Sequence, residues 1–166
     1  TLDAQTLFMP IAIAARETSD EQRQSLQTRF LALSASHAKN SDLLLGLAAL
    51  QEQSGLYDES LANISKAQNI NKKDMPARLF EVDVLYKSGR PDKAIKKLSD
   101  LVAENADNDR LRLQYARLLT EQDLQKAREQ FDYLAKANSL EPDLLLARAL
   151  VNYRLDDRKQ AQDLFE

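Results

Sequence analysis

The chain has 166 residues, of which 43% are hydrophobic and 30% are charged, and its formal net charge is −3. This length and apolar content suit one compact domain or a short repeat array, and they exclude wholesale disorder. With 3 Gly and 4 Pro, the chain has too few turn residues for a sandwich or barrel. The absence of Cys excludes a disulfide scaffold, an Fe–S site and a Cys zinc site, and the balanced charge argues against nucleic-acid binding.

The first two segments predicted to be helical run from Leu2 to Glu17 and from Asp20 to His37. An apolar run from Leu7 to Ala15 resembles a signal peptide in part, but Pro10 interrupts it and no Lys or Arg precedes it, so we predict a helix. No apolar run reaches the length of a transmembrane helix. Because the chain begins at Thr1 and stops within a helical pattern, we expect both ends to be cut from a longer protein.

Good helix formers dominate the remaining sequence, and no window of β-branched residues alternates with a period of two. Turn-forming residues separate the helical stretches at regular places: Ser54-Gly55, Asn71 to Asp74, Ser88-Gly89, Asn105 to Asp109 and Asn138 to Asp143. Pro76 and Pro142 lie where a helix can begin. The sequence therefore predicts an all-α chain of helices about 12 to 15 residues long, joined by short turns.

The helical stretches repeat with a period of 34 or 33 residues. A small residue recurs at Ser60, Ala94, Ala127 and Ala161, and a large apolar residue follows four positions later at Ile64, Leu98, Phe131 and Phe165. In the preceding helix, Leu recurs at Leu45, Leu79, Leu113 and Leu146. A helical hairpin of this length leaves one apolar face open, and stacking the next hairpin covers that face. The period therefore predicts a solenoid of stacked helix pairs.

This period, the turns from Gly55 to Ser60 and from Gly89 to Ala94, and the small-then-large pair resemble the tetratricopeptide repeat (TPR) family from Ser41 to Glu166. The resemblance implies a right-handed superhelical solenoid of antiparallel helix pairs. The chain departs from the family where an aromatic residue is expected near the start of each first helix. Those positions hold Leu44, Arg78, Arg112 and Leu145.

We divide the chain by the repeat pattern. Residues 1–40 form a degenerate, repeat-like helix pair, residues 41–74, 75–108 and 109–141 form three full repeats, and residues 142–166 form a truncated fourth repeat.

No residues form a catalytic or metal-binding pattern, so we expect no enzymatic activity, no cofactor and no metal. The one His, His37, has no nucleophile motif beside it and is expected to be an exposed residue at a helix end. Acidic pairs such as Asp58-Glu59 are expected to cap helices. The pairs Lys72-Lys73 and Lys96-Lys97 lack interleaved aromatic residues, which argues against a nucleic-acid patch.

In the TPR family the first helices of the repeats line a concave groove. The resemblance places four sets of residues there: Asp42, Leu45, Ala49, Glu52 and Gln53; Pro76, Leu79, Asp83, Tyr86 and Lys87; Arg110, Leu113, Arg117, Thr120 and Glu121; and Asp143, Leu146, Leu150, Tyr153 and Arg154. Among these we predict partner contacts by Leu79, Asp83, Tyr86, Arg110, Leu113, Arg117, Leu146, Tyr153 and Arg154. Tyr and Arg are enriched at binding hot spots. The alternative is that both Tyr pack on neighbouring repeats and that Arg117 and Arg154 pair with acids such as Glu121 and Asp157.

The sequence can be compared with two subtypes of the TPR family. Chaperone-binding members grip a C-terminal carboxylate with a Lys, Asn and Arg clamp, and only Arg110 is compatible with it among Leu45, Ala49, Phe80, Arg110 and Gln114. The third repeat, from Asn108 to Leu119 and from Lys126 to Phe131, is similar to gamma-proteobacterial outer-membrane lipoproteins that bring a C-terminal-processing protease to its substrates. That resemblance favours the periplasm over the cytoplasm.

The leading hypothesis is a non-enzymatic scaffold or adaptor that binds a peptide or a partner protein in the groove, without nucleic acid and without membrane insertion. A second hypothesis is a structural segment that associates with its own copy through exposed end faces, with Leu164 and Phe165 uncovered. A third is the non-catalytic part of a larger enzyme.

Overall fold

The computed structural model describes residues 19–137 and 142–164. Across them the chain forms nine helices and no strand, so the predicted all-α fold is confirmed. The helices are α2 (Asp20–Ser36), α3 (Ser41–Gln53), α4 (Tyr57–Ile70), α5 (Met75–Lys87), α6 (Pro91–Glu104), α7 (Asp109–Leu119), α8 (Leu124–Ala137), α9 (Pro142–Arg154) and α10 (Arg158–Asp163). None of these nine helices is long and apolar enough to cross a membrane. The helix predicted from Leu2 to Glu17 lies outside the described residues.

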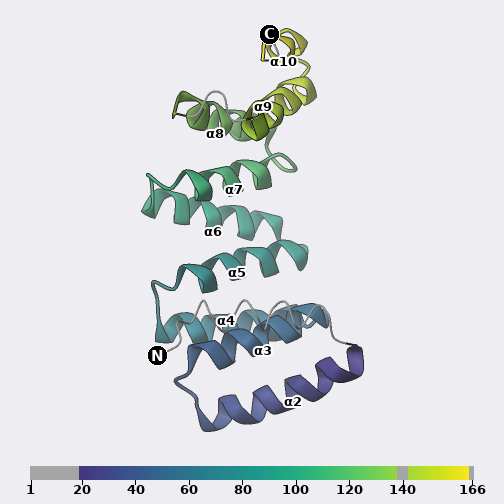
Figure 1. Cartoon of the computed structure of the whole chain (residues 1–166), viewed down its shortest axis with the longest axis vertical. Coiled ribbons are helices and arrows are strands. Elements are labelled where there is room, and N and C mark those ends of the chain that lie inside the picture. Colours follow the sequence, from purple (N-terminus) through teal and green to yellow (C-terminus); the bar gives the residue numbers. More distant parts are fainter. Residues whose placement is uncertain (1–18, 138–141, 165–166) are drawn as a thin grey trace. The chain divides into compact units, whose positions relative to one another are not determined.

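The chain divides into two compact units, Thr1–Ala94 and Ile95–Glu166, and the division falls within α6. In the first unit α2 packs on α3, α3 on α4 and α4 on α5. In the second unit α7 packs on α8, α8 on α9 and α9 on α10. Consecutive helices within each unit fold back on one another as antiparallel pairs (Figure 1).

The recurring small residue lets paired helices approach closely. Ser60, Ala94 and Ala127 are fully buried, and Ala161 is nearly so. The hydroxyl Oγ of Ser60 donates a hydrogen bond of 2.8 Å to the carbonyl oxygen of Ala48, which joins α4 to α3. A larger side chain at this position would push the two helices apart.

The recurring large residue fills the space beside each small one. Ile64 and Phe131 are fully buried, and Leu98 is 2% exposed. Ile64 belongs to the core of the first unit, where side chains of α3, α4 and α5 meet. Phe131 belongs to the core of the second unit, where α7, α8 and α9 contribute. Phe165, the fourth member of this column, lies outside the described residues.

The turns between paired helices depend on glycine in two places. Gly55 and Gly89 have φ angles of 74° and 75°, in the left-handed region that a residue with a Cβ rarely adopts. Both follow the end of a helix, where a left-handed residue satisfies the last carbonyl groups. The turn between α9 and α10 has Asp156 at φ 61° instead, since Asp tolerates this conformation better than most other residues.

Side-chain caps begin many of the helices. Ser19 accepts a hydrogen bond from the backbone N–H of Gln22, and the Gln22 side chain accepts one from the Ser19 backbone, a capping box at the start of α2. Five further side chains accept backbone N–H groups at helix starts: Asn40, Asp74, Asn108, Asp123 and Asp157. Pro76 lies in the first turn of α5, and α9 begins at Pro142. The turns predicted from Asn71 to Asp74 and from Asn105 to Asp109 are confirmed, whereas residues 138–141 of the turn predicted from Asn138 to Asp143 lie outside the described residues.

Arg112 takes the position where the TPR pattern expects an aromatic residue. Its guanidinium group lies 3.9 Å from the ring centre of Tyr133 in α8, close enough for a cation–π contact. The same group donates hydrogen bonds to Gln130 and to the carbonyl oxygen of Ala106. A polar clamp between α7 and α8 therefore replaces aromatic packing at this position.

Candidate partner-binding groove

Helix α5 places three of the predicted contact residues on one face. Leu79, Asp83 and Tyr86 are spaced i, i+4 and i+7, which brings side chains to the same side of a helix. Leu79 is half-buried, whereas Asp83 and Tyr86 are exposed. This face presents an apolar base, a carboxylate and a phenol to solvent.

Lys87 pairs with Asp83 on this face and with Glu52 of α3, and the second pair joins α5 to α3. Its Nζ lies 2.7 Å from Asp83 and 2.8 Å from Glu52, whose side chain is only 7% exposed. Burial acts to lower the pKa of Lys87, but the hydrogen bonds to Asp83 and Glu52 outweigh it and raise that pKa above its ordinary value of 10.5. The ammonium group therefore keeps its proton and neutralises a buried carboxylate.

The predicted groove positions in the first full repeat are partly wrong. Leu45 is 1% exposed and Ala49 is 2% exposed, so neither side chain can meet a partner. Both belong to the buried cluster that also contains Ala77 and Val84 of α5. Packing between neighbouring helix pairs removes these two residues from the surface.

Helix α7 lines a cavity in the second unit. Arg110, Leu113 and Arg117 are spaced i, i+3 and i+7 on one face, and all three line a cavity of about 310 Å³. Leu134 from α8 and Leu144 from α9 provide further apolar lining. The structure thus brings together three residues that the sequence predicted for the groove.

Two carboxylates share this cavity with the arginines. Asp109 lies in the first turn of α7 and Asp143 in the first turn of α9, where the positive end of each helix stabilises a negative charge. The cavity therefore offers an apolar centre with both cationic and anionic groups around it. Such a lining can hold an apolar side chain and also hydrogen-bond a peptide backbone.

The arginines of the second unit differ in their partners. Arg128 pairs with Asp157 at 3.7 Å, Arg148 pairs with Asp132 at 3.0 Å, and Arg154 pairs with Glu121 at 3.1 Å. The guanidinium groups of Arg110 and Arg117 make no ion pair with any residue in the described part of the chain. Of the two arginine pairings weighed from the sequence, that of Arg154 is present and that of Arg117 is absent.

Helix α9 carries the last group of predicted residues. Leu146 and Tyr153 are 60% and 61% exposed, and both line a second cavity of about 390 Å³ between α9 and α10. Leu150, also in this cavity, is 55% exposed. Arg154 lies just beyond them in the last turn of α9. Tyr153 does not pack into the core.

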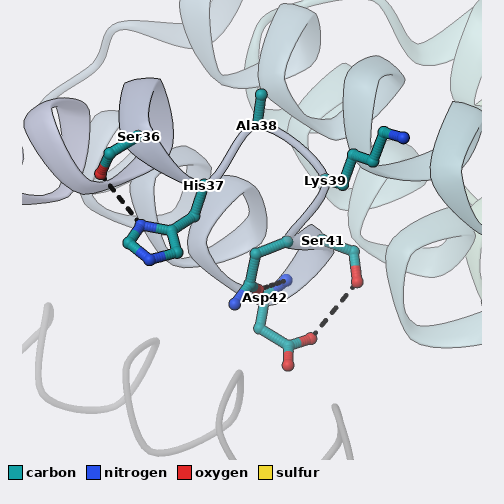
Figure 2. A pocket seen from close by; sticks show the side chains of 7 residues that line it. Ser36, His37, Ala38, Lys39, Ser41 and Asp42 are labelled. Carbon is teal, nitrogen blue, oxygen red and sulfur yellow. Dashed lines mark hydrogen bonds between the residues drawn. The ribbon is translucent and has the colours of Figure 1, made fainter.

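A third hollow, of about 590 Å³, lies at the connection between α2 and α3 and contains His37 (Figure 2). The Nδ1 atom of His37 lies 2.9 Å from the Ser36 hydroxyl and 3.2 Å from the carbonyl oxygen of Leu33. The Ser36 hydroxyl itself donates to the carbonyl oxygens of Ala32 and Leu33. His37 is exposed at the C-terminal end of α2, as predicted, and within the described residues no carboxylate hydrogen-bonds its ring in the way that a catalytic triad requires.

No group of three or more His, Cys, Asp or Glu side chains able to hold a metal ion occurs within residues 19–137 and 142–164.

Sequence reasoning did not find every residue that lines the two cavities of the second unit, the one beside α7 and the one between α9 and α10. It missed Leu134, Leu144 and Asp109 in the first and Arg158 and Ala161 in the second. These residues belong to neighbouring helices or to helix starts, and a helical period shows only which residues share one face of one helix. The recurring small-residue column contains Ala161, but nothing in that column indicates an opening beside it.

No protein-family model matches the chain. A curated protein of Pseudomonas aeruginosa, the TPR repeat-containing protein PA4667, is 33% identical over 111 residues, which cover 67% of this chain and 19% of that protein. Among solved structures, MamA from Desulfovibrio magneticus RS-1 is 16% identical with a TM-score of 0.70, over 98% of this chain and 92% of that one. The chain has the tetratricopeptide-repeat fold. The likeness to PA4667 supports its place in that repeat family.

The structure of YrrB, described as a TPR protein with an unusual peptide-binding site, is also similar to this TPR chain. It is 16% identical with a TM-score of 0.64, over 87% of this chain and 75% of that one. The TPR chain spans about a fifth of the length of PA4667. A whole protein of such length has parts about which these residues say nothing.

Proposed function

We propose that this TPR chain is a non-enzymatic scaffold whose groove binds a peptide segment or a partner protein. The observation that carries the proposal is the α7 cavity, where Arg110 and Arg117 flank Leu113 without an ion-pair partner in the described residues. An apolar side chain of the partner would fill the cavity against Leu113, Leu134 and Leu144. The two guanidinium groups would then hold carboxylate or carbonyl oxygens beside it.

The repeat architecture supports this role. Within each unit, helices that pack on one another hold their side chains in place, so little conformational entropy is lost when a partner binds. The proposal includes the division of the chain into repeats at 41–74, 75–108, 109–141 and 142–166, with a degenerate helix pair at 1–40. YrrB, a protein of the same fold, is described as having a peptide-binding site.

The test is an affinity capture from native lysate with the chain as bait, read by mass spectrometry. The key variant is the double change Arg110→Ala and Arg117→Ala, and the matched control is Lys159→Ala, which removes an exposed charge outside the cavity. A partner held by the parent and the control but lost by the double variant supports the groove. Loss of hot-spot residues is expected to weaken binding at least tenfold. Partner profiles that are identical for parent and double variant would refute the proposal.

The finer proposal is an adaptor for a C-terminal-processing protease in the periplasm. It rests on the similarity of the third repeat to lipoprotein adaptors. The same capture tests it, since such a protease would appear among the partners only if the role is correct. A partner set confined to cytoplasmic proteins would reject the adaptor role and leave the scaffold proposal intact.

A further inference from the structure

The cavity of about 310 Å³ beside α7 carries opposite charges at its two ends. Helices α7 and α9 each pack antiparallel on α8, so their N-terminal ends lie at the same end of the second unit. That end of the cavity carries the carboxylates of Asp109 and Asp143 together with the guanidinium group of Arg110. The other end carries Arg117, in the last turn of α7. One end of the cavity is therefore acidic on balance, and the other is basic.

These four charged groups are not neutralised within the second unit. None of them makes an ion pair with any residue in the ranges 19–137 and 142–164. The acid one turn beyond Arg117 is Glu121, and it is held instead by Arg154 at 3.1 Å. Internal pairing therefore does not account for the charges around the cavity, which leaves them available to a ligand.

The repeat pattern does not require these charges either. Arg117 corresponds to Asp83 one period earlier and to Leu150 one period later, and Arg110 corresponds to Pro76 one period earlier. Residues that pack one helix pair on the next recur with the period. The charge arrangement is therefore particular to this cavity and is not a by-product of stacking.

The next helix pair along the chain already packs beside the cavity. Leu144 of α9 lines it together with Leu134 of α8, and Leu113 packs against the cluster that contains both. In a stack of helix pairs each pair contacts only its neighbours. Helix pairs stacked after α10 would therefore leave the cavity beside α7 open.

The spacing of the charged groups matches that of side chains along an extended peptide. Leu113 lies four residues from Asp109 and four residues from Arg117, which is about 6 Å along the axis of α7 in each direction. Side chains at positions i and i+2 of an extended chain share a face and are about 6.5 to 7 Å apart. When one side chain enters the cavity against Leu113, the side chains two positions before and after it reach the charged ends.

An extended segment fits the cavity better than a helix does. A volume of about 310 Å³ accommodates one apolar side chain, whereas a whole helix is about 10 Å across. The carbonyl groups of an extended segment are free to accept hydrogen bonds, whereas those of a helix are bonded internally. Arg110, which shares its end with two carboxylates, is therefore placed to donate to a backbone carbonyl oxygen of the segment.

We propose that the cavity beside α7 binds an extended segment of a partner protein with the alternating pattern base-x-apolar-x-acid, in either chain direction. The acid pairs with Arg117, and the base pairs with Asp109 and Asp143. The apolar side chain lies against the leucines of the cavity. The proposal rests on the proposed function, to which it adds the charges and the spacing that the partner must have.

The experiment titrates short peptides, capped at both ends to remove their terminal charges, into the 166-residue chain, with fluorescence anisotropy as the readout. The mixed peptides are Lys-Ser-Leu-Ser-Glu and the reverse order, Glu-Ser-Leu-Ser-Lys, which present the same alternation in opposite directions. The comparison peptides are Lys-Ser-Leu-Ser-Lys and Glu-Ser-Leu-Ser-Glu, and each mismatches one end of the cavity. The better mixed peptide should bind about fivefold more tightly than either comparison peptide, as expected for one partly exposed ion pair.

Substitutions in the chain separate the two ends. Arg117→Gln should abolish the preference for the mixed peptide over the peptide with two Lys and should keep the preference over the peptide with two Glu. Asp109→Asn together with Asp143→Asn should do the converse. The matched control Lys159→Gln, at an exposed residue outside the cavity, should alter neither preference. Circular dichroism confirms that each variant is helical.

Several outcomes would overturn the proposal. They are absence of binding by every peptide, equal affinity of the parent chain for all of them, and preferences that the substitutions at the two ends leave intact. Tighter binding of a crosslinked helical peptide with Lys, Leu and Glu at i, i+4 and i+8 would overturn the extended form of the ligand.

Failure of this proposal is distinguishable from failure of the scaffold proposal, which the lysate capture with Arg110→Ala and Arg117→Ala tests. A partner whose capture depends on these arginines, together with equal affinity for all the peptides, would retain the scaffold and reject the charge pattern.

Discussion

The buried ion pair between Glu52 and Lys87 gives a sharp test of how neighbouring helix pairs are joined. The Glu52 side chain is 7% exposed and depends on Lys87, at 2.8 Å, for its compensating charge. Replacement of Lys87 with Met keeps the aliphatic stem and removes the charge. The buried carboxylate then loses its cation while its desolvation cost remains.

The magnitude follows from the exposure of the two partners. Removal of one partner from a fully buried pair costs about 3 to 5 kcal/mol. The Lys87 side chain is 34% exposed and also contacts the exposed Asp83, so solvent screens part of the interaction. We therefore expect Lys87→Met to lower the free energy of unfolding by about 2 kcal/mol.

The assay is urea denaturation followed by circular dichroism, with Glu52→Gln and the double variant completing a double-mutant cycle. Lys87→Met should cost about 1 kcal/mol less in the Glu52→Gln background than in the parent, because the neutral amide has no buried charge to leave unpaired. An equal cost in both backgrounds would refute the reasoning. It would mean that Lys87 stabilises the chain through its stem alone.

The remaining predictions concern pH, packing and backbone conformation. The pKa of Lys87 is raised above 10.5, so its contribution to stability is complete below that pH and is lost as the pH rises through the folded-state pKa. Above pH 10.5 the denaturation midpoint of the parent should therefore fall, and that of Lys87→Met should fall much less. Phe131→Ala should lower the stability of the second unit by about 4 kcal/mol in the same denaturation assay, since the ring is fully buried, whereas Leu146→Ala on the exposed face should change it by less than about 0.5 kcal/mol; comparable losses would contradict the assigned burial. Gly89→Ala should cost about 1 kcal/mol through its φ of 75° alone, because a Cβ there would touch nothing within 4 Å, and a thermal melt that is unchanged would contradict this conformation. Asp156→Gly should stabilise the chain by up to about 1 kcal/mol for the converse reason, and a lower melting temperature would count against it.

The comparison of expectation with structure is clearest at individual residues. Gly55 and Gly89 predicted helix-ending turns because few other residues adopt a positive φ, and both have it. The small column at Ser60 and Ala127 predicted close helix contacts, and both residues are fully buried. These properties depend on local geometry and on a short repeat period, which one sequence displays.

The sequence predicted the charge pairing and the exposure of the candidate site residues less well than it predicted the fold. Arg117 and Arg154 occupy similar places late in their helices, yet Arg154 pairs with Glu121 and Arg117 pairs with no described residue. Leu45 and Leu146 occupy the same repeat position, yet one is buried and the other is 60% exposed. In each case the difference depends on what the neighbouring helix pair contributes.

The sequence by itself determined the helical class, the repeat period, the glycine turns and the recurring small and large residues that pack between paired helices, because each of these follows from local propensity and from spacing along the chain. Only the tertiary structure decided which apolar faces are covered, which charges are compensated and where the cavities lie. Those features arise between helices that are distant in sequence, and burial depends on whether a neighbouring helix is present to exclude water.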